Sequence, residues 1–217
     1  RAVDPLLPLR LLANPVATWA TAASSLNSLG YFSLLIYLPV YFESVHRLSP
    51  SAAGLLLVWM LVGTTVGAWL AARLSQRLVH YKRPALVGVL VCIVLSAALA
   101  LYAHVMPLPV LAAVLGIMGL GIGTVFPIGT ISLQNAIDRR DLGIGTASIN
   151  FFRSLLGALG VALAGTLTVD AIGAGHIPGA ADPAVIAAFA NVFWVAALAF
   201  TGSFACFSKM PELPLRG

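Results

Sequence analysis

Long apolar runs separated by short polar segments repeat along the whole chain. Each run has about 20 or more residues, which is enough for an α-helix to cross the roughly 30 Å hydrocarbon core of a bilayer. The short alternating segments of a membrane β-barrel do not occur. The pattern therefore predicts an all-α membrane protein with six transmembrane helices, at residues 15–42, 51–76, 84–105, 108–137, 142–171 and 183–207.

Prolines mark several of the predicted helix boundaries. Asn14 followed by Pro15 combines a capping side chain with a proline at the first helical position. Pro84 opens the third run in the same way. Pro127 instead lies inside the fourth run, where it removes a backbone donor and should kink the helix.

The basic residues predict how the six helices face the membrane. Ten of the twelve Lys and Arg residues fall on one side of the predicted bundle, and positively charged segments stay in the cytoplasm. We therefore expect a cytoplasmic lead-in at 1–14, a cytoplasmic tail at 208–217 and a location in a bacterial inner membrane. A basic cytoplasmic loop between the second and third helices contains Arg73, Arg77, Lys82 and Arg83.

Composition agrees with a membrane protein and excludes other classes. Hydrophobic residues make up 60% of the chain and charged residues 9%, with a net charge of +5. Because membrane orientation explains the positive charge, we expect no nucleic-acid partner. Cys92 and Cys206 both lie in apolar runs, and no histidine has metal-ligand spacing, so no disulfide and no metal site is expected. The sequence begins at Arg1 without a methionine, and we expect it to be part of a longer protein.

Arg153 is the one cation in the middle of a predicted span. It lies eleven residues beyond Leu142, about 16 Å along a helix and close to the bilayer midplane. An unpaired charge at that depth costs roughly 3 kcal/mol, so the side chain should face the bundle interior. No acidic residue is expected at its depth. Its predicted partners are helix-end carbonyls, a carboxylate from a missing half, or the amides of Gln134, Asn135 and Asn150.

Three roles for Arg153 follow from this position, and the sequence leaves them open. The side chain can brace the cytoplasmic part of the bundle by extending toward the interface. It can act in gating between two halves of a transporter. It can also contact a substrate or a proton carrier directly.

A polar cluster and three aromatic residues are candidates for the lining of a cavity. The cluster is unusual for a lipid-facing helix and should face either a wet cavity or another helix. The aromatic residues can form a wall for flat lipophilic molecules, although packing in the core explains them equally well. The polar cluster comprises Thr21, Ser24, Ser25, Asn27 and Ser28, and the aromatic residues are Tyr31, Phe32 and Trp59.

Glycines on the fourth and fifth runs are spaced so that several share a helix face. Small residues let helices approach closely in membranes. Glycines near Pro127 also suit a helix that bends. The glycines concerned are Gly116, Gly119, Gly121, Gly123, Gly157 and Gly160.

Three segments resemble the major facilitator superfamily. They are PLLPLRLLANP, RLSQRLVHYKRP and GLGIGTVFPIGTISLQNAIDRRDLGIGTASINFFRSLLGALG. They are most similar to the C-terminal half of its fourteen-span drug:proton antiporters, the EmrB/QacA-like multidrug exporters. The family's Gly-x-x-x-Asp-Arg loop signature is incomplete, because Ala72 and Gln76 stand at its Gly and Asp positions ahead of Arg77. The charge relay attributed to that signature is therefore not expected in this part of the chain.

The resemblance implies a mechanism and a set of partners. It implies two three-helix inverted repeats that pair with an N-terminal transmembrane half in the lipid bilayer and alternate in access to a central cavity. The implied function is efflux of lipophilic or cationic drugs, driven by the proton gradient with no cofactor. A major-facilitator transporter of a metabolite or organic anion is the alternative.

Two other classes of protein are weaker interpretations. An intramembrane enzyme needs a nucleophile and a base at one depth, but the sequence has no Gly-x-Ser-x-Gly motif and every histidine is expected near a membrane edge. A non-transporting membrane scaffold leaves Arg153 and the polar first span without a purpose. We therefore expect no enzymatic activity.

Overall fold

The computed structural model describes residues 14–75, 82–173 and 183–211, and these residues are helical with no β-strand. The predicted all-α class is confirmed for them. Arg77, most of the lead-in and the end of the tail lie outside the described residues. The helices are α2 (Pro15–Ser44), α3 (Pro50–Ser75), α4 (Arg83–Tyr102), α5 (Leu108–Ala136), α6 (Leu142–Gly173) and α7 (Pro183–Lys209), and a short 3-10 helix, η1 (Arg139–Asp141), joins α5 to α6.

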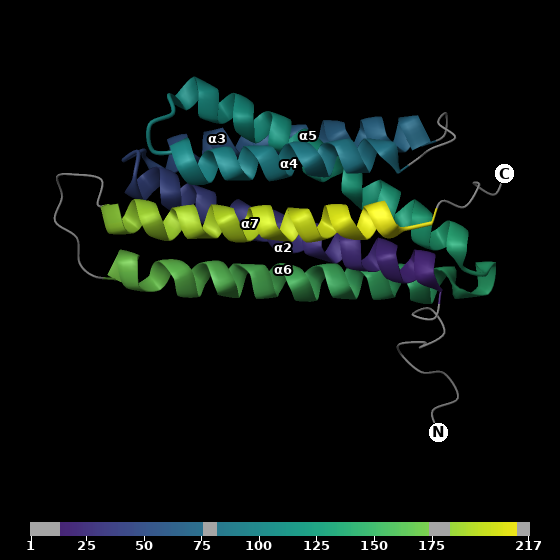
Figure 1. Cartoon of the computed structure of the whole chain (residues 1–217). Coiled ribbons are helices and arrows are strands. Elements are labelled where there is room, and N and C mark those ends of the chain that lie inside the picture. The colour runs from purple at the N-terminus through teal and green to yellow at the C-terminus, as the bar shows by residue number, and fades with distance from the viewer. Residues whose placement is uncertain (1–13, 76–81, 174–182, 212–217) are drawn as a thin grey trace.

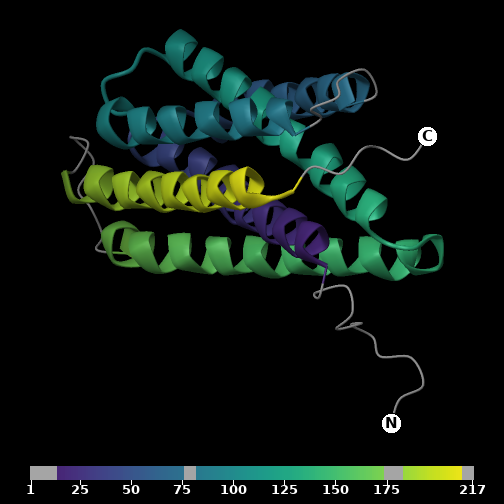
Figure 2. The same ribbon diagram turned by 45° about the vertical axis from the view of Figure 1, so that its right-hand side comes forward.

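Helices α2 and α5 hold the bundle together. Helix α2 packs against α6, α7, α5 and α3, and α5 packs against α3, α4, α2 and α6. In both ribbon views α5 runs obliquely past its neighbours, from the group formed by α3 and α4 to the start of α6 (Figures 1 and 2). Because these two helices cross near the centre, residues on α2, α5 and α6 can meet in one place.

Five of the six helices are long and apolar enough to cross a membrane: α3, α4, α5, α6 and α7. Helix α2 has sufficient length, but its polar cluster lowers its hydropathy. Ser24, Asn27 and Ser28 are fully buried, so these polar side chains face other helices instead of lipid. Membrane-spanning composition is thus established for five helices, and a sixth crossing by α2 stays a prediction.

The predicted start of α2 is confirmed in its capping geometry. The Asn14 side-chain oxygen accepts hydrogen bonds from the backbone N–H groups of Val16 and Ala17, at 3.0 and 3.4 Å. Its side-chain nitrogen donates to the carbonyl of Ala136 at 2.7 Å. Asn14 therefore both begins α2 and ties that end of the helix to the end of α5.

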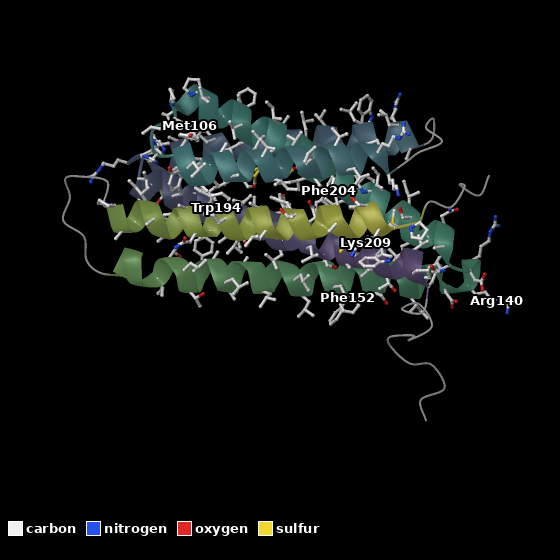
Figure 3. The ribbon with its side chains drawn as sticks, in the orientation of Figure 1. Met106, Arg140, Phe152, Trp194, Phe204 and Lys209 are labelled. Carbon is white, nitrogen blue, oxygen red and sulfur yellow. The ribbon has the colours of Figure 1, made fainter. Side chains whose placement is uncertain are left out.

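Most of the described basic residues lie at the end of the bundle where α2 begins and α7 ends, while Arg47 follows the opposite end of α2 and Arg153 lies within α6. Arg140 and Lys209 lie toward this end and Met106 lies at the opposite end (Figure 3). Lys209 lies over the ring of Trp19, with 5.8 Å between its Nζ and the ring centroid. On α3, the Arg73 guanidinium lies 4.7 Å from the ring centroid of Trp69. Paired cations and aromatic rings of this kind are typical of a membrane–water interface.

Glycines allow the backbones of α3 and α5 to touch. A Cβ added at Gly119 would collide with the carbonyl of Met60, and one at Gly123 would collide with the carbonyl of Thr64. On α3, a Cβ at Gly67 would likewise collide with the carbonyl of Leu120. Backbone atoms cannot move aside as a flexible side chain can, so this interface requires glycine at these positions.

The two neighbouring glycines on α5 differ from this pattern. Gly121 faces α4, where its Cβ would meet the carbonyl of Gly88 and the sulfur of Cys92. At Gly116 an added Cβ would have the Trp59 carbonyl at 3.8 Å, an ordinary contact. These glycines of α5 therefore serve different faces of the helix, and Gly116 has room for a side chain.

We predict that Gly119→Ala destabilises the bundle and that Gly116→Ala does not. The added methyl group at position 119 must push α3 and α5 apart, at a cost of about 1–3 kcal/mol. Thermal unfolding of the purified protein in detergent measures the difference as a lower Tm for the first variant alone. Equal Tm values for the two variants would contradict the close backbone approach.

Candidate functional site: an arginine that links three helices

The Arg153 guanidinium joins α6 to the two central helices. Its Nη2 donates to the hydroxyl oxygen of Ser24 on α2 at 3.2 Å and to the carbonyl oxygen of Phe126 on α5 at 2.9 Å. The first bond spans 129 positions in the sequence and the second spans 27. One nitrogen of a single side chain thus connects three membrane-embedded helices.

The rest of the guanidinium is poorly satisfied. Its Nη1 donates to the Asn150 side-chain oxygen at 3.4 Å, a long contact, and its Nε is buried without a hydrogen-bond partner. Among the side chains that the structure describes, no carboxylate forms a salt bridge with Arg153. The positive charge is therefore held by neutral dipoles alone, in surroundings where a charge is expensive.

Phe126 binds the arginine through both its backbone and its ring. It directly precedes Pro127, which lacks the N–H that would bond to the Gly123 carbonyl and so loosens this turn of α5. The Phe126 carbonyl also accepts a bond from the Thr130 hydroxyl at 3.0 Å. The guanidinium carbon lies 5.3 Å from the Phe126 ring centroid, within the range of a cation–π interaction.

Gly129 leaves the space in which Ser24 and Arg153 meet. A Cβ added at Gly129 would collide with the Ser24 hydroxyl and lie 3.2 Å from Nη2 of Arg153. Since Gly129 is one turn beyond Phe126 on α5, the arginine contacts a stretch of helix that combines a proline with a missing side chain. The close approach of α2 to α5 at this point depends on both features.

Two of the three predicted aromatic residues lie beside this site. The Tyr31 ring centroid lies 5.9 Å from that of Phe126, in an edge-on arrangement, and 5.2 Å from that of Phe32. Trp59 does not join them. It lines a separate groove with Leu108 at the start of α5, eighteen residues before Phe126, and is 56% exposed. The structure thus brings Tyr31 and Phe32 together with Phe126 and places Trp59 elsewhere, and an aromatic wall for a substrate stays a prediction.

The polar cluster of α2 lies against other helices. Ser24, Asn27 and Ser28 are fully buried and Ser25 is 3% exposed, while Thr21 is partly exposed. The sequence left two surroundings open, a wet cavity or another helix. In this conformation the four serine and asparagine side chains lie against other helices. The Ser25 and Ser28 hydroxyls donate to carbonyls of their own helix. The Asn27 amide has no hydrogen-bond partner for either of its side-chain atoms.

The predicted partners of Arg153 are only partly correct. Asn150 contacts it at 3.4 Å. Gln134, in the last turn of α5, donates to the Thr146 hydroxyl at 3.2 Å instead, and Asn135 lies beside it in the same turn. Sequence reasoning missed the Phe126 carbonyl because it considered helix ends as acceptors. Pro127 did not signal it, because the carbonyl that a proline at position 127 deprives of its helical donor is that of Gly123.

Helices α2 and α6 also share a groove beyond the arginine. Close contact begins at Gly157 and Gly160, where an added Cβ would meet the Phe32 ring and the Leu29 carbonyl. A mainly apolar groove of about 700 Å³ follows between the two helices, and its lining also includes Tyr37 and Thr166. Its nearest lining residue on α6, Val161, is eight residues past Arg153, about 12 Å along the helix. No group of three or more His, Cys, Asp or Glu residues that could hold a metal occurs in the described parts of the chain.

The chain is similar in sequence to known transporters. A family model described as Major Facilitator Superfamily matches residues 2–161. The multidrug transporter protein MdtP of Bacillus subtilis (strain 168) is 27% identical over 170 residues, covering 77% of this chain and 31% of that protein. The puromycin resistance protein pur8 of Streptomyces alboniger is 29% identical over 185 residues, covering 80% of this chain and 35% of that protein. The chain therefore spans about a third of the length of these curated relatives.

We predict that Ser24→Ala destabilises the protein by about 1–2 kcal/mol, because it removes an acceptor from a partly buried cation. Ser25→Ala is the matched control, since the Ser25 hydroxyl bonds only within its own helix. Thermal unfolding should show a lower Tm for Ser24→Ala than for the control.

A double-mutant cycle separates the Arg153 contact from other effects of the missing hydroxyl. In an Arg153→Met background, Ser24→Ala should have no more effect than Ser25→Ala. An undiminished effect of Ser24→Ala in that background would show that Ser24 acts independently of the arginine.

Proposed function

The chain belongs to the major facilitator superfamily, and from that premise we propose that it is the C-terminal half of a fourteen-span, proton-coupled exporter of lipophilic or cationic drugs. It is an integral membrane transport protein and not an enzyme. The names of its relatives, which include a multidrug transporter and a puromycin resistance protein, support drug efflux. The aromatic cluster of Tyr31, Phe32 and Phe126 supports a lipophilic substrate.

Helix packing supports two inverted repeats within this half. Exchanging α2 with α5, α3 with α6 and α4 with α7 converts the α2–α6 contact into α3–α5, and the α2–α7 contact into α4–α5. The α2–α3 contact likewise becomes α5–α6. The two helices of each exchanged pair are three helices apart in the chain. Because successive membrane-spanning helices run in opposite directions, the two helices of a pair are antiparallel, which is the arrangement of an inverted repeat.

The basic end of the bundle is proposed to face the cytoplasm. Arg73, Lys82, Arg83, Arg140 and Lys209 all lie at the end where α2 begins and α7 ends. Positively charged segments stay cytoplasmic. Both ends of this chain and the α3–α4 and α5–α6 connections then lie on the cytoplasmic side of the inner membrane.

Arg153 is proposed to gate movement between the halves of the transporter. The observation that supports this role is its bonding to α2 and to the Pro127 kink of α5 without any described carboxylate. Its Nε and Nη1 remain available to a carboxylate from the N-terminal half, which would compete with the present bonds and release α5. The unpartnered amide of Asn27 supports a second packing arrangement in which that amide is bonded.

A transporter of organic anions or metabolites is the second candidate. The observation that favours it is the same cation, whose free donors suit an anionic substrate as well as a protein carboxylate. The two candidates differ in the charge of the molecule that should compete for the site.

We predict that Arg153→Ala and Arg153→Lys both abolish efflux while the protein inserts normally. Lysine keeps the charge but lacks the planar fork that places one donor between Ser24 and Phe126. The reading frame containing these residues is expressed in bacteria without their own multidrug pumps, and drug resistance is compared with the level of membrane-inserted protein. Arg140→Ala, which removes an exposed cation from η1, is the control and should transport normally. Full efflux by Arg153→Ala would reduce the residue to a structural brace.

We predict that cells producing the exporter accumulate less ethidium and that a protonophore abolishes the difference. Proton-coupled export of a lipophilic cation requires both results, which fluorescence of cell-associated ethidium records. An organic-anion transporter should leave ethidium unchanged and alter the accumulation of a fluorescent anion such as carboxyfluorescein. That outcome would replace drug efflux with the second candidate.

A further inference from the structure

Helices α3 and α4 are consecutive in the chain but barely touch. Helix α5 packs against both and fills the space behind them (Figure 2). The exchange of helices described above maps this pair onto α6 and α7, which are in wider contact. The bundle is therefore open between α3 and α4, and the two proposed repeats differ at this place.

A groove of about 440 Å³, here called the α3–α4 groove, occupies this opening. Gly88 of α4 and Gly121 of α5 are in direct contact at its base, since a Cβ on either would meet the carbonyl of the other. The two glycines let α4 and α5 approach closely and form part of the floor of the groove. The walls include Leu74, Val87 and Val91.

The groove is apolar and opens sideways. The hydroxyl of Thr124, the only uncharged polar side chain among the described lining residues, is bonded to the Gly121 carbonyl at 2.7 Å. Val87 is 63% exposed and Ile117 is 49% exposed, so the opening faces outward from the bundle. All three helices around it have membrane-spanning composition. An apolar opening between three such helices suits the hydrocarbon of a bilayer.

A cation stands at one end of the groove. Arg83, an exposed residue in the first turn of α4, lines that end, and Val91 lies eight residues further, about 12 Å along the helix. Arg73, beside the wall residue Leu74, lies over the ring of the exposed Trp69 at the same end. Neither α3 nor α4 contains an acidic residue. The groove thus joins a positively charged membrane–water interface to an apolar channel parallel to the helices.

We propose that the α3–α4 groove binds an anionic phospholipid from the surrounding bilayer. One acyl chain lies over Gly88 and Gly121, and the phosphate pairs with Arg83. Basic pockets between transmembrane helices recognise anionic headgroups in this way. The groove between α2 and α6 offers a contrast, because it is also apolar and none of its described lining residues is charged. Charge at the rim therefore distinguishes the α3–α4 groove as a site for an anionic lipid.

Native mass spectrometry tests the proposal on the purified full-length protein that contains these residues. The protein is equilibrated in micelles containing equal amounts of phosphatidylglycerol and phosphatidylcholine, and the lipids retained after gentle release are counted. One phosphatidylglycerol should be retained with a preference of about fivefold over phosphatidylcholine, the effect expected for one interfacial arginine. Excess glycerol 3-phosphate should not displace it, because the acyl chain contributes to binding.

Two pairs of variants separate the headgroup site from the acyl-chain site. Arg83→Gln should abolish the preference, while Arg140→Gln, which removes the same charge from the same end outside the groove, should keep it. Val91→Phe should lower retention by filling the groove, while Val94→Phe, on an exposed position of the same helix, should not. Circular dichroism checks that each variant is folded.

An unchanged preference in Arg83→Gln, or an equal loss in Arg140→Gln, would overturn the proposal in favour of general attraction to positive charge. Displacement by glycerol 3-phosphate would replace the lipid with a free phosphate ligand. If Val91→Phe does not fold, the arginine pair decides the result alone.

Discussion

Close approach of helix backbones is the constraint on which the rest of this bundle depends. Inside a membrane, apolar side chains gain little by leaving lipid for protein, so helices associate through tight packing and hydrogen bonds. The contacts at Gly67, Gly119 and Gly123 bring α3 against α5, and Gly160 brings α6 against α2. These contacts fix the positions of the two central helices. Only with α2 and α5 so placed can one arginine on α6 reach both.

Arg153 shows how a membrane bundle can hold a charge with no opposite charge among the described side chains around it. Its Nη2 finds a hydroxyl and a carbonyl, and an aromatic face lies within cation–π range. Each of these groups is a dipole or quadrupole, so none fully offsets the charge. These contacts hold the side chain in place, but the guanidinium could still accept a stronger partner such as a carboxylate. An incompletely satisfied, partly buried cation is well suited to a site that must alternate between two states.

The helices were readable from the sequence because their signals are local. Apolar length predicted the helical class, and Asn14-Pro15 predicted a capped start that the structure confirms. The contacts of Arg153 depend instead on how α2 and α5 cross, which no local pattern encodes. Ser24 was recognised as unusual and Pro127 as a kink, but their meeting at one guanidinium required the fold. The separation of Trp59 from Tyr31 has the same origin. The sequence does not distinguish these two aromatic residues, and only the packing places Trp59 beside the start of α5 and Tyr31 beside Phe126.

The bond from Arg153 to Phe126 ends on a main-chain oxygen, which every residue type supplies. A change of side chain at position 126 would remove the ring but leave the acceptor in place. Evolution can therefore alter that position without a matching change at the arginine. Methods that infer contacts from paired substitutions between homologous sequences should detect the Ser24–Arg153 pair more readily than the shorter bond beside it.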